Sequence, residues 1–474
     1  MKKNLFWLGL ALCAGFVMTS CDDDDDLGNG GVKDLADDQP AAMVTPNGFY
    51  VANEDWAGHD NGSINYFKRN GNEYDINYRV YRAANSGEKL GGVTEYASIW
   101  GDNVYMLSKN DLHLVVASAK DFRKKAEIKD FGAEAHQFLG IDDKKAYVSF
   151  GDNQRGGIAK LNLNNFSQVE NIQGINEQIG NMCLSNGMIF ALGTENLYII
   201  NAQTDLVVKE IPGSFRAVIV DKDGDVWVAS NNGFVKYDSE SLETETVPYP
   251  ENGEVYGTEW AWNANSLCAS TQENCIYWLS GASSWVLNSI WKYDVDNKQA
   301  VKLYEITACE LEQVPSFYGA GLRVDPVTDE LIALAVLNFK QSFVYKIDNK
   351  GKELGQYALL GDNGTANLEG GYYFWFPALP FFEDANQPQI LLNQVKVKVG
   401  ETEEVDLDEK VVDYDNIFAS MMFELTPAES NQAQVMLDGD DLKVKGVQPG
   451  VTACKLAVIS NGVRVEKNIQ IVVE

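Results

Sequence analysis

Short apolar runs separated by turn residues dominate the pattern of hydrophobic and polar positions, and the segment Ala217–Val247 shows it most clearly. Four runs occur there, divided first by Asp221–Asp225 and then by Asn231-Asn232-Gly233, which are residue types that tolerate positive φ angles. The inner runs are apolar enough to be buried on both faces, whereas Glu243–Val247 alternates charged residues with Thr and Val. The pattern predicts a four-stranded sheet that needs copies of itself on either side to bury its faces.

The same pattern recurs along the chain. Ranges that repeat its first hairpin are Ala97–Leu107, Gln137–Ser149, Asn181–Leu192, Ser266–Leu279 and Gly321–Val336. A period of about 35 to 55 residues with four strands per unit is typical of a β-propeller. We count seven units, of which the first, opening at Gly48, lacks its innermost strand. We therefore predict an all-β, seven-bladed propeller over residues 44–386, closed by pairing of Tyr372–Phe382 with Gly48–Ala52.

The composition changes near Gln387, after which short alternating strands continue to the C-terminus. Their spacing over residues 387–474 predicts a small, separate β-sandwich. No catalytic group stands out in this part of the sequence, so we expect a spacer or stabilising module.

The N-terminal residues predict export. Lys2 and Lys3 precede the apolar run Leu5–Met18 and small residues before Cys21, which is the pattern of a secretory signal peptide over residues 1–20. Residues 21–43 include five consecutive aspartates and predict an acidic tether, disordered to about Ala42. The signal resembles that of bacterial lipoproteins, which implies lipidation of Cys21; the alternative is an ordinary signal with an incidental cysteine.

Charge and cysteine usage exclude several classes of function. The formal net charge is −31, which repels nucleic acid and anionic lipid, so membrane attachment is expected through the lipid alone. Neither the three histidines nor the cysteines show metal-ligand spacing, and no motif for a metal or cofactor is predicted. Cys268 and Cys275 flank a predicted hairpin turn and could form a disulfide, but buried free thiols are favoured.

Several longer segments resemble a known family. NGFYVANEDWAGHDNGSINYF, WAWNANSLCASTQENCIYW, SFYGAGLRVDPVTDELIALA and YYFWFPALPFFED resemble the YncE-like propeller lipoproteins of Bacteroidota, and VKVGETEEVDL resembles bacterial Ig-like domains. The acidic run after Cys21 is similar to the surface-export signal of such lipoproteins, implying an outer-membrane location facing the cell exterior. Some similar proteins capture cobalamin for a TonB-dependent transporter, but no motif here singles out a corrinoid.

Loop lengths indicate where a ligand would bind. Turns between first and second strands are short, whereas the loops between second and third strands and between blades are long, and these should lie together on one face. Aromatic residues on such loops suit a flat or amphipathic small molecule, a glycan or a protein partner. The predicted ligand-binding residues are Trp56, Tyr96, Tyr256, Trp285 and Tyr318. Trp260, Trp262 and Tyr372 are expected to pack against strands, and the alternative for every one of these aromatics is a plug for the propeller.

Three functions remain open from the sequence. The first is non-catalytic capture of a ligand beside a TonB-dependent receptor, and the second is a lyase or hydrolase that uses loop carboxylates such as Glu259, Glu310 and Glu312. The third is a protein–protein scaffold. No catalytic residue is assigned. Asp221–Asp225 departs from a calcium loop and predicts a hairpin turn, and the acidic loop with Glu54-Asp55 and His59-Asp60 is interpreted as solvated and not as a cation site.

Overall fold

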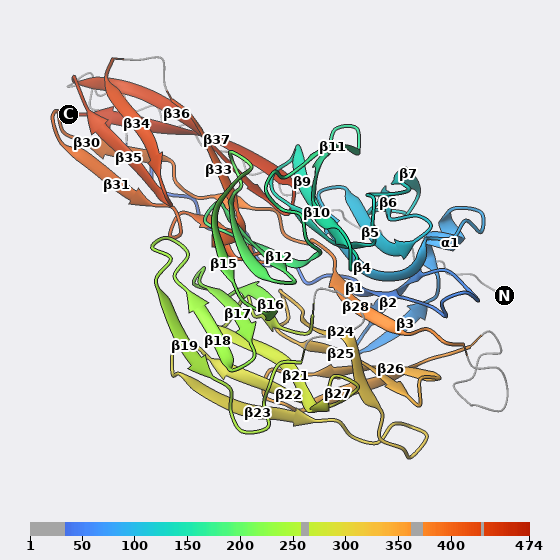
Figure 1. Cartoon of the computed structure of the whole chain (residues 1–474). Coiled ribbons are helices and arrows are strands. Elements are labelled where there is room, and N and C mark those ends of the chain that lie inside the picture. Colours follow the sequence, from blue (N-terminus) through green and yellow to red (C-terminus); the bar gives the residue numbers. More distant parts are fainter. Residues whose placement is uncertain (1–33, 257–264, 362–372, 428–430) are drawn as a thin grey trace, which may run out of the picture. The chain divides into compact units, whose positions relative to one another are not determined.

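Strands make up nearly all of the regular structure in the computed structural model, which describes residues 34–256, 265–361, 373–427 and 431–474 (Figure 1). Residues Ala36–Glu474 form one compact unit. The described helices are the short α1 (Val80–Ala84) and the 3-10 helix η1 (Phe418–Ser420). No described helix has the length and apolar character needed to cross a membrane.

Seven blades of four antiparallel strands follow one another around a ring, which confirms the predicted propeller; pairing of Leu287 with Phe317 joins the sixth and seventh into one eight-stranded sheet. From the innermost to the outermost strand, the blades are β28 (Pro377–Phe382), β1 (Gly48–Asn53), β2 (Ser63–Asn70) and β3 (Glu73–Asn77); β4 (Gly92–Trp100), β5 (Asn103–Asn110), β6 (Leu114–Ser118) and β7 (Lys124–Ile128); β8 (Ala135–Gly140), β9 (Lys145–Gly151), β10 (Gly156–Asn162) and β11 (Ser167–Asn171); β12 (Ile179–Ser185), β13 (Met188–Gly193), β14 (Asn196–Asn201) and β15 (Leu206–Pro212); β16 (Phe215–Val220), β17 (Val226–Ser230), β18 (Gly233–Tyr237) and β19 (Thr244–Pro248); β20 (Cys268–Ala269), β21 (Cys275–Ser283), β22 (Val286–Asp294) and β23 (Gln299–Glu305); β24 (Ser316–Val324), β25 (Leu331–Leu337), β26 (Gln341–Ile347) and β27 (Glu353–Leu359).

The predicted closure of the ring is also confirmed. β28 pairs with β1, placing Phe49 opposite Phe382 and Tyr50 opposite Phe381, so the last propeller strand completes the first blade. This strand begins at Pro377 and not at Tyr372, which lies outside the described residues. Before Pro377 the chain bonds to the loop after β1 instead, through the amide of Glu54 and the carbonyl of Phe376 at 2.9 Å.

The blades are held together by apolar strands that are buried on both faces. Every residue of β25 and β26 is buried, whereas every residue of the outer strand β11 is exposed. Trp227, Trp278 and Trp375 are among the largest fully buried side chains and lie between neighbouring blades. Such two-sided burial explains why the inner runs of the sequence show little alternation.

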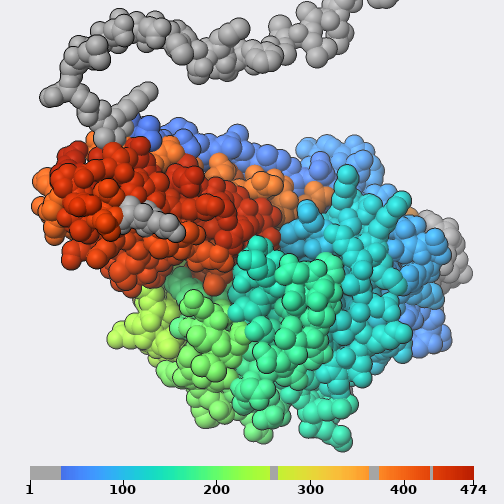
Figure 2. Space-filling view, turned by 90° about the horizontal axis from the view of Figure 1, so that it is seen from above, coloured from blue at the N-terminus to red at the C-terminus, as the bar shows by residue number. Residues whose placement is uncertain are grey.

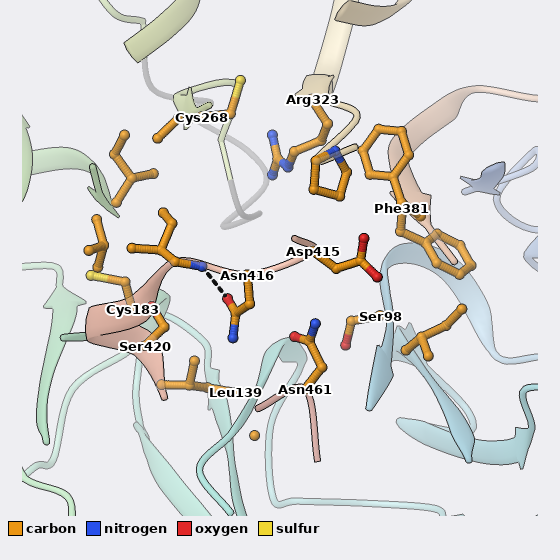
Figure 3. A pocket seen from close by; sticks show the side chains of 18 of the residues that line it. Ser98, Leu139, Cys183, Cys268, Arg323, Phe381, Asp415, Asn416, Ser420 and Asn461 are labelled. Atoms are coloured by element: carbon orange, nitrogen blue, oxygen red, sulfur yellow. Dashed lines mark hydrogen bonds between the residues drawn. The ribbon is translucent and has the colours of Figure 1, made fainter. Parts of the chain in front are cut away.

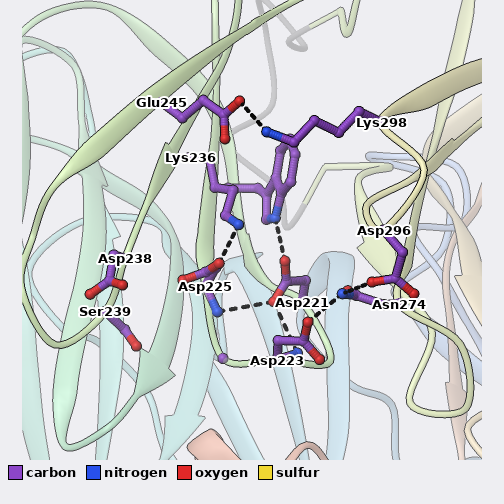
Figure 4. Close-up of polar contacts among 12 residues, drawn as sticks. Asp221, Asp223, Asp225, Lys236, Asp238, Ser239, Glu245, Asn274, Asp296 and Lys298 are labelled. Atoms are coloured by element: carbon purple, nitrogen blue, oxygen red, sulfur yellow. Dashed lines mark hydrogen bonds and ion pairs between the residues drawn. The ribbon is translucent and has the colours of Figure 1, made fainter.

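The turn Asp221–Asp225 is a hairpin turn between β16 and β17, as predicted (Figure 4). The carboxylate of the fully buried Asp221 accepts hydrogen bonds from the amide of Asp225 at 2.9 Å and from the indole of Trp227 at 2.6 Å. Burial raises the pKa of Asp221 to about 6. Asn274 donates to Asp223 and so connects this turn to the next blade.

Residues after the ring form two facing sheets around their own hydrophobic core. One sheet has the order β30 (Gln394–Val397), β37 (Val463–Val473), β36 (Gly450–Ser460) and β33 (Met422–Thr426), and the other the order β31 (Thr402–Asp406), β35 (Asp441–Gly446) and β34 (Ala433–Asp438). The short strands β29 (Gln389–Ile390) and β32 (Val411–Val412) pair with each other. Leu442, Leu456 and Ile469 are buried in this core, which agrees with the predicted sandwich. We call residues 387–474 the C-terminal sandwich.

The expectation of disorder to about Ala42 is wrong from Ala36 onward. The amide of Asp38 bonds to the carbonyl of Leu391 at 2.9 Å, and the ammonium of Lys467 lies 2.8 Å from the Asp38 carboxylate. Further along, Val44 exchanges hydrogen bonds with the Asn386 side chain at 2.7 and 3.0 Å. In Figure 2 the blue residues of this segment accordingly lie beside the orange and red C-terminal residues. Polar groups more than 340 positions away therefore hold a segment that has little apolar surface of its own.

The five cysteines that the structure describes, Cys183, Cys268, Cys275, Cys309 and Cys454, are free. Cys268 lies opposite Tyr277 in the β20–β21 hairpin and not opposite Cys275, so the favoured prediction of free thiols is confirmed.

Candidate functional site

The antiparallel order of the blades gives the propeller two faces. We define the short-turn face by the turns between the first and second strands of each blade, and the long-loop face by the loops between second and third strands and between blades. The C-terminal sandwich contacts the short-turn face: the amide of Asn186 bonds to the carbonyl of Ala419 at 2.7 Å, and the Ser420 hydroxyl to the carbonyl of Leu184 at 2.9 Å. The long-loop face lies at the opposite ends of the strands.

Six aromatic side chains form a continuous row on the long-loop face, which we call the aromatic belt. Its members are, in order, Trp285, Phe339, Tyr318, Phe376, Phe374 and Trp56. Successive ring centroids are 6.2, 6.4, 5.9, 5.9 and 4.2 Å apart, within the range of edge and offset contacts. The belt crosses three neighbouring blades, because Trp285 lies between β21 and β22, Phe339 between β25 and β26, and Trp56 between β1 and β2.

Exposure distinguishes this row from the other aromatic residues. Trp56, Trp285 and Phe339 are 41%, 50% and 45% exposed, and within the described residues no other aromatic side chain is exposed to this degree. All three belong to the belt. Val286 at the start of β22 and Val314 in the loop before β24 are also exposed, by 50% and 60%. Contiguous exposed apolar surface of this kind marks a binding site more often than isolated exposed residues do.

The backbone holds two belt rings in an unfavourable conformation. Phe339 and Phe376 have φ angles of 55° and 44°, in the left-handed region that large side chains rarely adopt. Such residues persist when the surrounding structure determines their conformation, and they occur preferentially at functional sites.

A carboxyl group lies behind the middle of the belt. The Tyr318 hydroxyl donates to Oε2 of Glu54 at 3.2 Å, while the Tyr318 ring contacts Phe339 and Phe376. Burial, followed by repulsion from the nearby Glu95, raises the pKa of Glu54 to about 8. Glu95 is itself buried, and its carboxylate forms an ion pair with the Lys109 ammonium, 2.8 Å away. The interpretation of this acidic loop as solvated is therefore wrong for Glu54, and also for the buried Asp55.

The remaining charges of that loop are paired. The Asp60 carboxylate forms ion pairs with Arg82 at 3.0 Å and with Lys89 at 2.6 Å. Burial alone would raise the pKa of Asp60, but the hydrogen bonds from these partners outweigh it, and the pKa falls far below its usual range. His59 stacks on Trp56 with 3.5 Å between ring centroids. In the described part of the chain, no group of three His, Cys, Asp or Glu residues could hold a metal ion.

A cavity lies on the propeller axis, apart from the belt (Figure 3). It is a cavity of about 430 Å³ lined by residues from all seven innermost strands and, at the short-turn end, by Asp415, Asn416 and Asn461 of the C-terminal sandwich. The Arg323 side chain reaches this cavity and donates to the carbonyl of Asn265 at 2.8 Å. Tyr96 also lines the cavity, where burial raises the pKa of its hydroxyl.

The five predicted ligand-binding residues therefore fall into three places. Trp56, Trp285 and Tyr318 come together in the belt, as the loop argument predicted. Tyr96 is on the innermost strand β4, whose side chains reach the axis, and it lines the cavity instead. Tyr256 lies against Arg216, with 5.9 Å from the guanidinium carbon to the ring centroid, beside a separate hollow that also includes Tyr249 and Asn252.

Sequence reasoning missed Phe339, Phe374 and Phe376. Phe339 stands in the turn between two fully buried strands, where a large apolar residue is unexpected, and this contrast could have identified it. The sequence predicts Phe374 and Phe376 in the strand Tyr372–Phe382, whereas that strand begins at Pro377 in the structure. Of the loop acids considered for catalysis, Glu310 and Glu312 are exposed and Glu259 lies outside the described residues, as do Trp260, Trp262 and Tyr372.

Comparisons with known proteins found one family and several solved structures. A family model described as "Domain of unknown function (DUF5074)" matches residues 47–383, more than half of the chain. A quinonprotein alcohol dehydrogenase-like protein from Bacteroides thetaiotaomicron is similar over 71% of this chain and 78% of its own, with 18% identity and a TM-score of 0.52. A protein from Lactobacillus plantarum (10% identity, TM-score 0.47, 66% of this chain and 100% of that one) and a functionally unknown protein from Desulfotomaculum acetoxidans (15%, 0.46, 70% and 99%) are also similar. No curated protein matches the sequence.

Proposed function

We propose that this chain, which belongs to the DUF5074 family, binds a small molecule on the aromatic belt of its long-loop face without converting it. The observation that carries the proposal is the gathering of every strongly exposed aromatic side chain of the described residues, Trp56, Trp285 and Phe339, in one row. Exposure of large apolar groups to water is unfavourable. Their retention at one place, partly in a strained backbone, supports a role in binding.

The belt suits a ligand that is recognised by stacking. Its rings lie on loops of three blades that a rigid propeller positions, as in other binding surfaces built on a scaffold. The net charge of −31 opposes the approach of a polyanion. Corrinoids, other flat or amphipathic molecules and neutral glycans remain the candidate ligands.

We also propose that the protein acts at the cell surface, as a lipoprotein of the outer membrane that faces the exterior and assists a TonB-dependent receptor. The signal-like residues 1–20, Cys21 and the five aspartates after it support this proposal, and they lie outside the described residues. In the native host, Cys21→Ala is expected to move the protein from the membrane fraction to the soluble fraction, because a lipid would be its anchor. Full retention of Cys21→Ala in membranes would contradict the anchor.

A catalytic function is the second candidate, and one observation favours it. Glu54 has a raised pKa beside the belt, a property shared with general acids in enzymes. However, of the other carboxyl groups that act on Glu54, Glu95 is engaged by Lys109 and Asp55 is buried. Binding without turnover therefore fits the geometry better.

The test is a thermal-shift screen of the purified protein against corrinoids, porphyrins and glycans, followed by titration of the hit. Trp56→Ala and Trp285→Ala should each weaken binding by about 1–3 kcal/mol, the range for losing an aromatic anchor. Leu206→Ala is the matched control, because Leu206 is 61% exposed on the outer strand β15. A hit that ignores both tryptophans would place the site elsewhere, and chemical conversion of the hit would favour an enzyme.

A further inference from the structure

We propose that the aromatic belt selects a ligand that carries a positive charge, an ammonium or quaternary ammonium group, and that the Glu54 carboxylate faces that charge. This inference rests on the proposed binding at the belt and adds the chemical class of the ligand. It is carried by three features: the place of Glu54, the pairing of the charges around it, and the rings in front of it.

Two adjacent residues of the belt determine the position of Glu54. Its amide donates to the carbonyl of Phe376 at 2.9 Å, and its Oε2 accepts the Tyr318 hydroxyl at 3.2 Å. Phe376 and Tyr318 are adjacent members of the belt, with ring centroids 5.9 Å apart. The carboxyl group therefore lies at the centre of the row, and Glu54 as a residue is half-buried.

The ionised form of Glu54 has no paired positive charge among the described residues. The charged and titratable groups that act on it are Glu95, Lys109, Tyr318 and Asp55. The Lys109 ammonium is 2.8 Å from the Glu95 carboxylate and pairs with that group. Among the described residues, no Lys or Arg nitrogen is within 4.0 Å of the Glu54 carboxylate, so an arriving cation would supply the missing opposite charge.

The rings in front of Glu54 suit the same ligand. A cation within about 6 Å of an indole or phenol face is attracted by the negative face of the ring, and quaternary ammonium groups are commonly bound in this way. Tyr318 and Phe376 are the belt rings beside Glu54, and Trp56 and Trp285 are the exposed indoles at the two ends of the row. A neutral ligand of the same shape would gain the apolar contact but neither the cation–π attraction nor the ion pair.

The proposal predicts that binding depends on pH in a defined direction. Burial raises the pKa of Glu54 to about 8, so at neutral pH most of the free protein carries this carboxyl in its neutral form. A cation binds the ionised form better, and the apparent affinity therefore rises with pH and becomes constant above about 8. Between about pH 6 and about pH 9 we expect roughly tenfold tighter binding or more.

The test compares choline with 3,3-dimethylbutan-1-ol, its neutral carbon analogue, by isothermal titration calorimetry on the full-length protein. Choline should bind at least several-fold tighter than the analogue at about pH 9, and the difference should shrink at about pH 6. Glu54→Gln should remove the pH dependence and reduce the preference to the part that the cation–π attraction supplies. Trp285→Ala should weaken both probes and leave the pH dependence of choline binding in place.

Two results would overturn the inference. Equal binding of the two probes, insensitive to pH in the wild type, would do so even if Glu54→Gln failed to fold. Absence of choline binding, together with a neutral hit that depends on Trp56 and Trp285, would do so as well. In both cases tryptophan-dependent binding would leave the proposed function standing, so the two proposals fail separately.

Discussion

At the short-turn face, groups of the propeller are hydrogen-bonded to the C-terminal sandwich, whereas at the long-loop face Trp56, Trp285 and Phe339 remain 41–50% exposed. The backbone amide of Asn186 in the propeller donates to the carbonyl of Ala419 in the sandwich. The Ser420 hydroxyl of the sandwich donates to the carbonyl of Leu184 in the propeller. The same fold thus satisfies one of its ends within the chain and leaves apolar rings in water at the other. This difference indicates that an outside ligand should bind at the long-loop face.

The largest effect is expected on removing the strand that closes the ring, on which both faces depend. A chain that ends at Phe376 lacks β28, and the inner edge of β1 is then unpaired beside an apolar core. We expect loss of the cooperative thermal transition measured by circular dichroism. A chain that ends at Gln387 is the control: it keeps β28 and should melt cooperatively, although its short-turn face is uncovered. Cooperative melting of the shorter chain would contradict the closure argument.

The next effect concerns the short-turn face. Asp221→Ala leaves the buried indole N–H of Trp227 and two backbone amides without their acceptor. Unsatisfied buried donors cost about 1–3 kcal/mol each, so we expect a loss of unfolding free energy of about 3 kcal/mol. Lys222→Ala, an exposed neighbour in the same turn, should change the unfolding free energy by less than about 0.5 kcal/mol. Ligand binding should be the same in both variants, since the turn is at the opposite face from the belt.

The matching experiment on the long-loop face uses the strained backbone of Phe339. Glycine adopts a φ of 55° without cost, whereas alanine at this position is disfavoured by about 1 kcal/mol. Chemical denaturation should therefore find Phe339→Gly about 1 kcal/mol more stable than Phe339→Ala. Both variants lack the ring and should weaken binding equally. Unequal binding of the two would show that the ring is not what the ligand contacts.

The contrast between the faces was partly accessible from the sequence. Counting strands predicts a missing innermost strand in the first unit and one left-over strand after the last, and this indicated the closure of Gly48–Ala52 with the last propeller strand. Loop lengths similarly brought Trp56, Trp285 and Tyr318 to one face. These inferences succeed because turn residues and strand periodicity are local properties.

Other features depend on residues that are far apart in the sequence. The burial of Glu54 results from Phe376 and Tyr318, which are more than 260 positions away, and an isolated acidic loop gives no sign of it. The order of the segment after Ala36 similarly depends on Asn386, Leu391 and Lys467. The sequence pattern predicts a strand from Ala97 and therefore places Tyr96 in a loop. In the structure β4 begins at Gly92 and includes Tyr96.

The smallest effect expected is a dependence of stability on pH that has one source at each face. Burial raises the pKa of Glu54 to about 8 at the long-loop face, and burial together with a hydrogen bond to Asp415 raises the pKa of Asp384 to about 8 next to the C-terminal sandwich. Each carboxyl holds a proton in the folded state that it releases in the unfolded state, where its pKa is near 4. The unfolding free energy should therefore fall as pH rises from about 4 to about 8 and become constant above that range.

Thermal melts over this range, in the wild type and two variants, would separate the two contributions. Glu54→Gln and Asp384→Asn each replace a neutral acid by a neutral amide, so each should flatten part of the dependence and leave the melting temperature near pH 5 almost unchanged. Glu310→Gln is the control, because Glu310 is exposed. A saturating cationic ligand should flatten the Glu54 contribution alone, because it favours the ionised form of that carboxyl and lowers its pKa in the folded state. Flattening of the Asp384 contribution by the same ligand would show that the ligand also acts at the short-turn end, against the division of roles between the two faces.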